Sequence, residues 1–134
     1  MDEIIGSLRV RQWVKNLVVF APLVFSARLL APFAVFGPLV GFVCFCLASS
    51  GVYLFNDILD RRIDRFHPRK KHRPVASGAL PLRPAWALTG LLLGGSLIAA
   101  ARFHAGLATW VLVYGLVNVA YSMALKRFVI LDVI

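Results

Sequence analysis

The chain has 134 residues, 60% of them hydrophobic, and its mean hydropathy is +0.79. A soluble domain of this length has too little interior to bury so much apolar surface, so the composition argues against a soluble fold and favours a protein dissolved in lipid. The net charge of +9 falls in a few clusters between long uncharged stretches, which differs from the continuous basic face of a nucleic-acid-binding protein and argues against a nucleic-acid partner.

Uncharged stretches of the sequence predict the membrane-spanning helices. The stretches 29–56, 84–101 and 103–125 have 28, 18 and 23 residues, and about 20 residues suffice for a helix to cross the hydrocarbon core. An earlier stretch, 16–27, has only 12 residues and spans only if it extends past Arg28, whose side chain can reach the interface; an interfacial or re-entrant segment is the alternative. We therefore expect one all-α domain over 1–134, a multi-pass transmembrane helix bundle with about four spans at about 14–30, 36–56, 84–101 and 105–124, and a polar loop at about 60–83.

Lys and Arg residues are divided unequally between the two sides of such a bundle. With four spans, thirteen of the fifteen lie on the side of the N-terminus and the polar loop, and only Arg28 and Arg102 lie on the other. Segments rich in Lys and Arg remain in the cytoplasm. The sequence therefore predicts a plasma-membrane protein with both termini and the loop in the cytoplasm.

The end of the second expected span carries the strongest chemical signal, the string Asn56-Asp57-x-x-Asp60-x-x-x-Asp64. On one helix the three aspartates fall within an arc of about 60 degrees, and Asn56 and Tyr53 extend that face. Three carboxylates on one face repel each other, so a positive charge is expected between them. Oxygen ligands without Cys or paired His favour Mg²⁺, which usually completes its shell with substrate phosphates. The pattern predicts a metal site at Asn56, Asp57, Asp60 and Asp64, the three aspartates as catalytic residues, and a diphosphate-containing substrate.

A simpler interpretation is that the aspartates only form ion pairs with Arg61, Arg62 and Arg65 at the membrane surface. This interpretation does not explain why Asn56 and Asp57 end an uncharged stretch of 28 residues. Polar groups at that depth usually face a cavity or the interior of a bundle. We therefore favour the cation site.

Further polar residues flank the aspartate string. Arg73 precedes Pro74, and a rigid turn there can aim its guanidinium at a phosphate. Three polar residues beside the first expected span, Gln12, Lys15 and Asn16, suggest that a ligand binds there. Lys126, near the last span, is also explained by a side chain that reaches the membrane interface. The Gly94-Gly95-Ser96 step is expected to let two helices approach closely. The expected substrate-binding residues are Gln12, Lys15, Asn16, Tyr53, Arg73, Tyr121 and Lys126.

At these residues the sequence resembles the UbiA superfamily of intramembrane prenyltransferases, because the aspartate string is similar to that superfamily's first aspartate-rich motif. Within the superfamily it most resembles the decaprenyl-phosphate phosphoribosyltransferases. The matching segments are Arg9-x-x-Gln12-Trp13-Val14-Lys15-Asn16, Ala21-Pro22-Leu23, Asp64-Arg65-x-His67-Pro68, Arg73-Pro74-x-Ala76-x-Gly78, Tyr121-Ser122, Leu125-Lys126 and Leu131-Asp132-Val133.

The resemblance implies a Mg²⁺-dependent membrane transferase that moves a phosphoribosyl group from phosphoribosyl pyrophosphate to a polyprenyl phosphate, in the precursor pathway of cell-wall arabinan. The aspartates and Asn56 would hold Mg²⁺ on the leaving diphosphate, and Lys15, Arg73 and Lys126 would hold phosphates. It also implies a helical bundle around a central cavity. This chain would form the N-terminal half of that bundle, as a fragment of a longer protein or with a second chain or a homo-oligomer completing it. The alternatives are a prenyltransferase that joins a prenyl diphosphate to an aromatic acceptor, and a non-catalytic membrane subunit.

Overall fold

The computed structural model describes residues 1–27 and 30–125, which form helices and turns and contain no β-strand. The all-α class expected from the sequence is therefore confirmed. In chain order the elements are α1 (Asp2–Leu8), η1 (Val10–Phe20), α2 (Ala21–Phe25), α3 (Phe36–Leu59), α4 (Arg61–Asp64), η2 (Lys70–His72), α5 (Pro74–Ser77), α6 (Leu82–Phe103), α7 (Ala105–Ala120) and η3 (Tyr121–Leu125).

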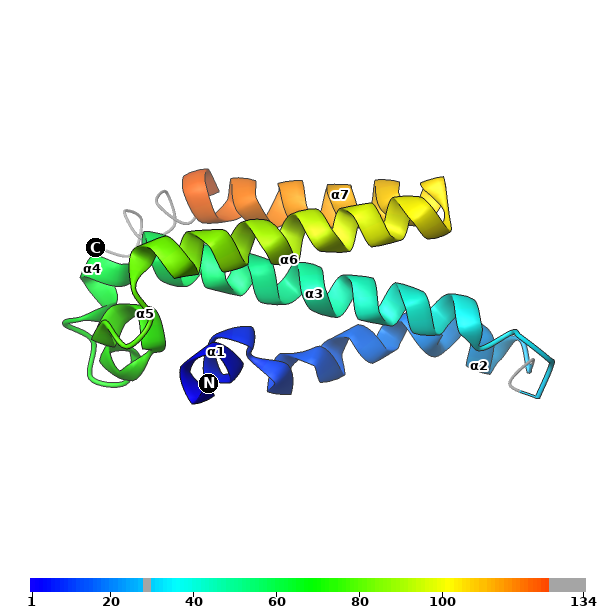
Figure 1. Cartoon of the computed structure of the whole chain (residues 1–134). Coiled ribbons are helices and arrows are strands. Elements are labelled where there is room, and N and C mark those ends of the chain that lie inside the picture. The colour runs from blue at the N-terminus through cyan, green and yellow to red at the C-terminus, as the bar shows by residue number, and fades with distance from the viewer. Residues whose placement is uncertain (28–29, 126–134) are drawn as a thin grey trace.

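Three long helices, α3, α6 and α7, pack against one another and lie side by side (Figure 1). Three helical ranges in the described chain, Phe36–Leu59, Leu82–Phe103 and Ala105–Ala124, are long and apolar enough to cross a membrane. Large apolar side chains such as Leu91 and Trp110 point outward from this bundle, where lipid rather than water is their favourable surrounding. The expected membrane helix bundle is confirmed.

The segment of the first expected span has a tighter helical form. Residues Val10–Phe20 form a 3₁₀-helix, η1, which packs along α3, and α2 continues it on the same side of α3 (Figure 1). A 3₁₀-helix rises about 2.0 Å per residue, so η1 and α2 together extend about 30 Å, close to the hydrocarbon thickness. Whether this segment crosses the membrane stays a prediction, and Arg28 lies outside the described residues.

α3 approaches α6 most closely at Gly51. A Cβ atom added there would lie 2.8 Å from Cγ of Leu93, nearer than carbon atoms approach each other. By contrast, a Cβ added at Gly94 or Gly95 would meet nothing within 4 Å in the described chain. The close approach expected at the Gly94-Gly95-Ser96 step is therefore wrong for the two glycines, although Ser96 is buried.

One end of the bundle gathers the N-terminal helix and the central loop. α1 contacts α5, and α4 follows directly on the last turn of α3 (Figure 1). Val75 of α5 and the following Leu80 are buried with Leu54 and Ile58 of α3. This small core fixes the loop over the end of α3, where the aspartate string lies.

Candidate functional site

A chain of ion pairs lies at this end of the bundle, at the C-terminal end of α3. Nη1 of Arg73 donates to Oδ1 of Asp57 and to Oδ2 of Asp64, at 2.9 Å in both cases. Nη2 of Arg9 donates to the same Oδ1 of Asp57 at 2.6 Å. The order of side chains is thus Arg9, Asp57, Arg73, Asp64, with alternating charges; we call these four side chains the ion-pair cluster.

The two carboxylates of the cluster come from consecutive helices, α3 and α4. Asp57 lies in the last turn of α3, and Asp64 ends α4. The single helix expected through Asp64 is interrupted at Asp60, which separates α3 from α4. The backbone hydrogen bonds from Asp60 to Asn56 and from Asp64 to Asp60 keep a helical path across that break, so Asp57 and Asp64 still face one guanidinium.

Arg73 is placed by the residues that follow it. Its backbone is extended, as expected before a proline, and Pro74 begins α5. Val75 and Ala76 are buried in the core, and Gly78 ends α5 with a φ of 86°. In the described chain the Arg73 guanidinium is aimed at two carboxylates, and its expected contact with a phosphate stays a prediction.

Arg9 is the member of the cluster that the expected site residues do not include. It lies between α1 and η1 with a φ of 50°, a left-handed conformation that is uncommon for a side-chain-bearing residue. Its guanidinium lies over the Tyr53 ring, 4.9 Å from the ring centre, which adds a cation–π contact to its ion pair. The only signal in the sequence was its place at the start of the Arg9-x-x-Gln12 segment.

For Asp57 and Asp64, the simpler ion-pair interpretation is wrong about the partners. Nε of Arg61 donates to the carbonyl of Val75 at 3.3 Å, and Nε of Arg65 donates to that of Ala76 at 3.2 Å. These two arginines therefore tie α4 to α5. In the described chain, the buried carboxylates pair instead with arginines that are distant in the sequence.

The other expected substrate-binding residues are distributed unevenly around the cluster. Tyr53 lies directly beneath Arg9. Gln12 is half-buried and lines a cavity of about 470 Å³ together with Arg9 and Arg11. That cavity offers hydrogen-bond donors and two positive charges, which suit an anion.

Asn16 and Lys15 stand farther along η1. The side-chain amide of Asn16 donates to Oγ of Ser49 at 3.3 Å and joins η1 to α3. Lys15 is exposed. Tyr121 begins η3 and is half exposed, whereas Lys126 lies outside the described residues.

The expected metal site contains two converging carboxylates, those of Asp57 and Asp64. Within residues 1–27 and 30–125, no three Asp, Glu, His or Cys side chains converge closely enough to hold a metal ion by themselves. Asp57 and Asp64 do share one positive group, which shows that their oxygens can converge on a common point. Two carboxylates are the usual protein contribution to a Mg²⁺ site that is completed by water and phosphate.

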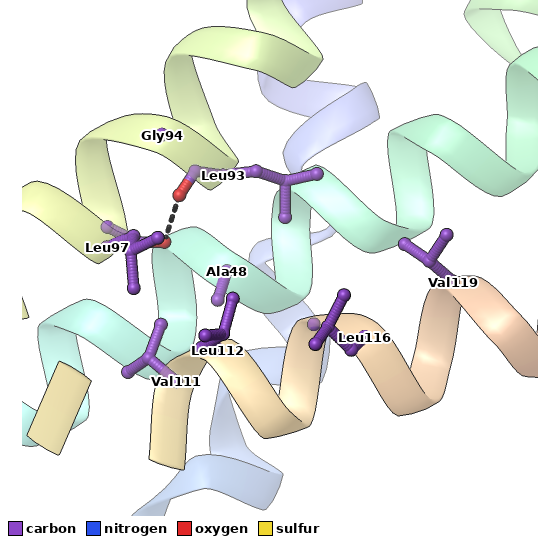
Figure 2. Close-up of a pocket in the computed structure, with 10 residues that line it drawn as sticks. Ala48, Leu93, Gly94, Leu97, Val111, Leu112, Leu116 and Val119 are labelled. Carbon is purple, nitrogen blue, oxygen red and sulfur yellow. Dashed lines mark hydrogen bonds between the residues drawn. The ribbon is translucent and has the colours of Figure 1, made fainter. Parts of the chain in front are cut away.

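A second, apolar cavity of about 250 Å³ lies between α3, α6 and α7. Figure 2 shows Leu93, Leu97, Leu112 and Leu116 lining it. Its lining contains no titratable side chain, so it offers no group for acid–base or metal chemistry. The charged side chains described above lie instead at the polar end of the bundle.

Known proteins resemble this chain over nearly all of its length. The decaprenyl-phosphate phosphoribosyltransferases of Mycolicibacterium smegmatis and Corynebacterium glutamicum are 39% and 36% identical to it, over 99% and 98% of this chain and 43% and 41% of their own. The UbiA prenyltransferase claS of Ampulloclitocybe clavipes is 43% identical over 54% of this chain and 25% of its own. The chain thus spans about two fifths of the length of the two phosphoribosyltransferases.

The family assignment follows from the sequence as a whole rather than from the aspartate string alone. Residues 17–134 match the UbiA prenyltransferase family, so the match includes the aspartate string, the central loop and the last two long helices. The ion-pair cluster lies within that range except for Arg9. The chain belongs to the UbiA prenyltransferase family.

Proposed function

We propose that this chain contributes the first half of the active site of a membrane transferase that moves a phosphoribosyl group from phosphoribosyl pyrophosphate to a polyprenyl phosphate. The observation that carries the proposal is that two buried carboxylates, those of Asp57 and Asp64, converge on one group at the C-terminal end of α3. It stands in a chain that is similar, over 99% of its residues, to a decaprenyl-phosphate phosphoribosyltransferase.

The donor set fits a Mg²⁺ ion bound to a diphosphate. Asp57 and Asp64 would supply carboxylate oxygens, and Asn56 and Asp60, in the last turn of α3 and at its end, are the further ligands expected from the sequence. The remaining positions would be filled by water and by phosphate oxygens of the donor. When bound, the metal would stabilise the negative charge that develops on the leaving diphosphate.

The protein's own groups would bind and orient the two substrates. Arg9, Arg73 and Gln12 lie at the same end of the bundle and would hold phosphate oxygens of the donor. Lys15 and Lys126 are proposed to hold phosphate groups as well. An oxygen of the lipid phosphate would attack the anomeric carbon, forming a new C–O bond as the bond to the diphosphate breaks. Fixing both substrates in this geometry is itself a large part of such catalysis.

The ion-pair cluster lies at the end of the membrane helices, where a lipid phosphate at the membrane surface could reach it, and the charges around it indicate which side of the membrane this end faces. α1, α4 and α5 gather at one end of the bundle (Figure 1), and this end carries most of the Lys and Arg residues. We propose that it faces the cytoplasm at the plasma membrane. A cysteine introduced at Lys70 should react with a membrane-impermeant maleimide only after the membrane is opened.

The transfer reaction is tested with membranes that contain this chain. Labelled phosphoribosyl pyrophosphate and decaprenyl phosphate should give labelled lipid, and the Asp57→Asn chain should give none. Label in a prenylated aromatic product, formed from a prenyl diphosphate, would support the second transferase reaction instead. If the unchanged chain forms neither product and does not bind a diphosphate, it is a non-catalytic subunit.

The chain matches only part of the length of its relatives, and the transfer test has to allow for this. Because the chain spans about two fifths of the similar phosphoribosyltransferases, we propose that further helices complete the cavity, in the same polypeptide, in a second chain or in a second copy. The transfer assay is therefore run on membranes of the native source as well as on the purified chain. Native mass spectrometry of the purified chain reports whether copies associate.

A further inference from the structure

The ion-pair cluster is closed by its own arginines. The side chains of Asp57 and Asp64 are only 3% and 2% exposed, whereas those of Arg9 and Arg73 are 24% and 27% exposed. The guanidinium of Arg73 bridges the two carboxylates, with one nitrogen 2.9 Å from each. A cation from solution therefore meets Arg73 before it meets either carboxylate.

We propose that Arg73 is an exchangeable counterion, which holds Asp57 and Asp64 together until a divalent cation replaces it. The cation and the Arg73 guanidinium then compete for the same two oxygens. The released guanidinium is free to bind an anion beside the cation. The proposal rests on the proposed function for the identity of that anion, a diphosphate, but not for the exchange itself.

The two arginines of the cluster differ in which carboxylates they contact, since Arg73 bridges Asp57 and Asp64 and therefore occupies the position that a shared cation would take. Arg9 contacts only Asp57 of the two carboxylates, and its guanidinium is supported by the Tyr53 ring. Arg73 lies in the turn between η2 and α5, and its extended backbone leaves its side chain reaching over from outside the long helices. Arg73 is therefore the group that moves, and Arg9 continues to compensate Asp57.

The balance of charge explains why the exchange favours a cation and an anion together. The four side chains of the cluster carry charges that cancel. A divalent cation that displaces Arg73 leaves the site positive, with an unpaired guanidinium beside it. The negative charge of a diphosphate then offsets this excess positive charge, and in turn it stabilises the bound cation. The cation alone can still displace Arg73, but it binds more tightly when a diphosphate is bound to the released guanidinium beside it.

The exchange is tested by the binding of Mn²⁺ alone, measured from the loss of the free Mn²⁺ electron paramagnetic resonance signal with the purified chain in lipid nanodiscs. Arg73→Gln should bind Mn²⁺ about tenfold more tightly than the unchanged chain, because a competing charge at ion-pair distance is removed. Arg69→Gln is the matched control, since it removes one positive charge from the same loop but contacts neither carboxylate in the described chain. It should change the affinity less than about threefold, as expected for an exposed charge. Equal affinities for Arg73→Gln and Arg69→Gln would overturn the proposal.

A second measurement uses the unchanged chain and does not depend on how a variant folds. Phenylglyoxal modifies accessible arginines, and mass spectrometry reads the modification of each one. Saturating Mn²⁺ should increase the modification rate at Arg73 severalfold and leave that at Arg69 constant. An unchanged rate at Arg73 while Mn²⁺ is bound, or absence of Mn²⁺ binding, would contradict the exchange. Failure of phosphoribosyl transfer with the exchange intact would instead reject the proposed reaction.

Discussion

Nη2 of Arg9 lies 2.6 Å from Oδ1 of Asp57, although 48 residues separate them in the sequence. This contact joins the N-terminal segment to the C-terminal end of α3, where the candidate site lies. The carboxylate is almost completely buried, so the ion pair forms in surroundings that contain little water to screen it. The N-terminal segment is therefore part of the site rather than a separate anchor.

Removal of the Arg9 charge should destabilise the fold. Arg9→Gln is expected to lower the free energy of unfolding in detergent by about 1–3 kcal/mol, because a buried carboxylate loses a charge-assisted hydrogen bond. Arg11→Gln is the control, since Arg11 is exposed and forms no ion pair in the described chain. It should change the free energy by less than about 0.5 kcal/mol. Equal effects of the two substitutions would mean that the Arg9–Asp57 pair contributes nothing specific.

The carboxylates should be required for stabilisation by Mg²⁺. With Mg²⁺ at about ten times its Kd, the unchanged chain should gain about 1.4 kcal/mol of stability. Asp57→Asn and Asp64→Asn should lose this gain, because each removes an oxygen charge from the shared position. Asp2→Asn, which changes an exposed acid in α1, should keep it. Differential scanning fluorimetry with and without Mg²⁺ measures the effect, and a full Mg²⁺ gain in Asp57→Asn would exclude a site at this residue.

The sequence predicted the long helices, the aspartates and Arg73 of this candidate site, but not Arg9 or the pairing of the arginines with the aspartates. Uncharged stretches fix where α3, α6 and α7 can lie, and the spacing of Asp57 and Asp64 places them on one face. Both rules depend only on neighbouring residues. The pairing of Asp57 with Arg9 depends instead on how α1 returns to α3, which no local pattern describes.

Helix packing shows the same division between local and tertiary information. The Gly94-Gly95 pair has the composition of a close helix contact, yet the contact lies at Gly51. Which face of α6 meets α3 is set by the fit of Leu92 and Leu93 against α3. Such a fit is a property of two surfaces, so composition alone did not locate it.

The contact at Gly51 gives a prediction about packing. Gly51→Ala should destabilise the chain by about 1–3 kcal/mol, because the new methyl group would overlap Leu93 and push α3 and α6 apart. Gly90→Ala is the matched control in α6, where an added Cβ meets nothing within 4 Å. It should leave stability unchanged or raise it by up to about 1 kcal/mol, since alanine favours a helix. Unfolding in a mixed-detergent titration, followed by circular dichroism, compares the two; an equal effect would reject the close contact.

Gly78 follows α5 as its C-terminal cap and thereby helps to place Arg73, which lies five residues earlier and caps the other end of α5. Its φ of 86° is in the left-handed region, and an added Cβ would meet nothing within 4 Å, so a substitution there meets backbone strain without a clash. Gly78→Ala should cost about 1–2 kcal/mol of stability, whereas Gly78→Asn should cost less, because asparagine tolerates this conformation better than alanine does. In nanodiscs, the thermal unfolding temperature should thus be highest for the unchanged chain, lower for Gly78→Asn and lowest for Gly78→Ala. If the strain is relieved by a shift of α5, the Arg73 bridge weakens as well, and Mn²⁺ should bind Gly78→Ala more tightly than Gly78→Asn. Equal stability of the two variants would show that the left-handed turn does not constrain this loop.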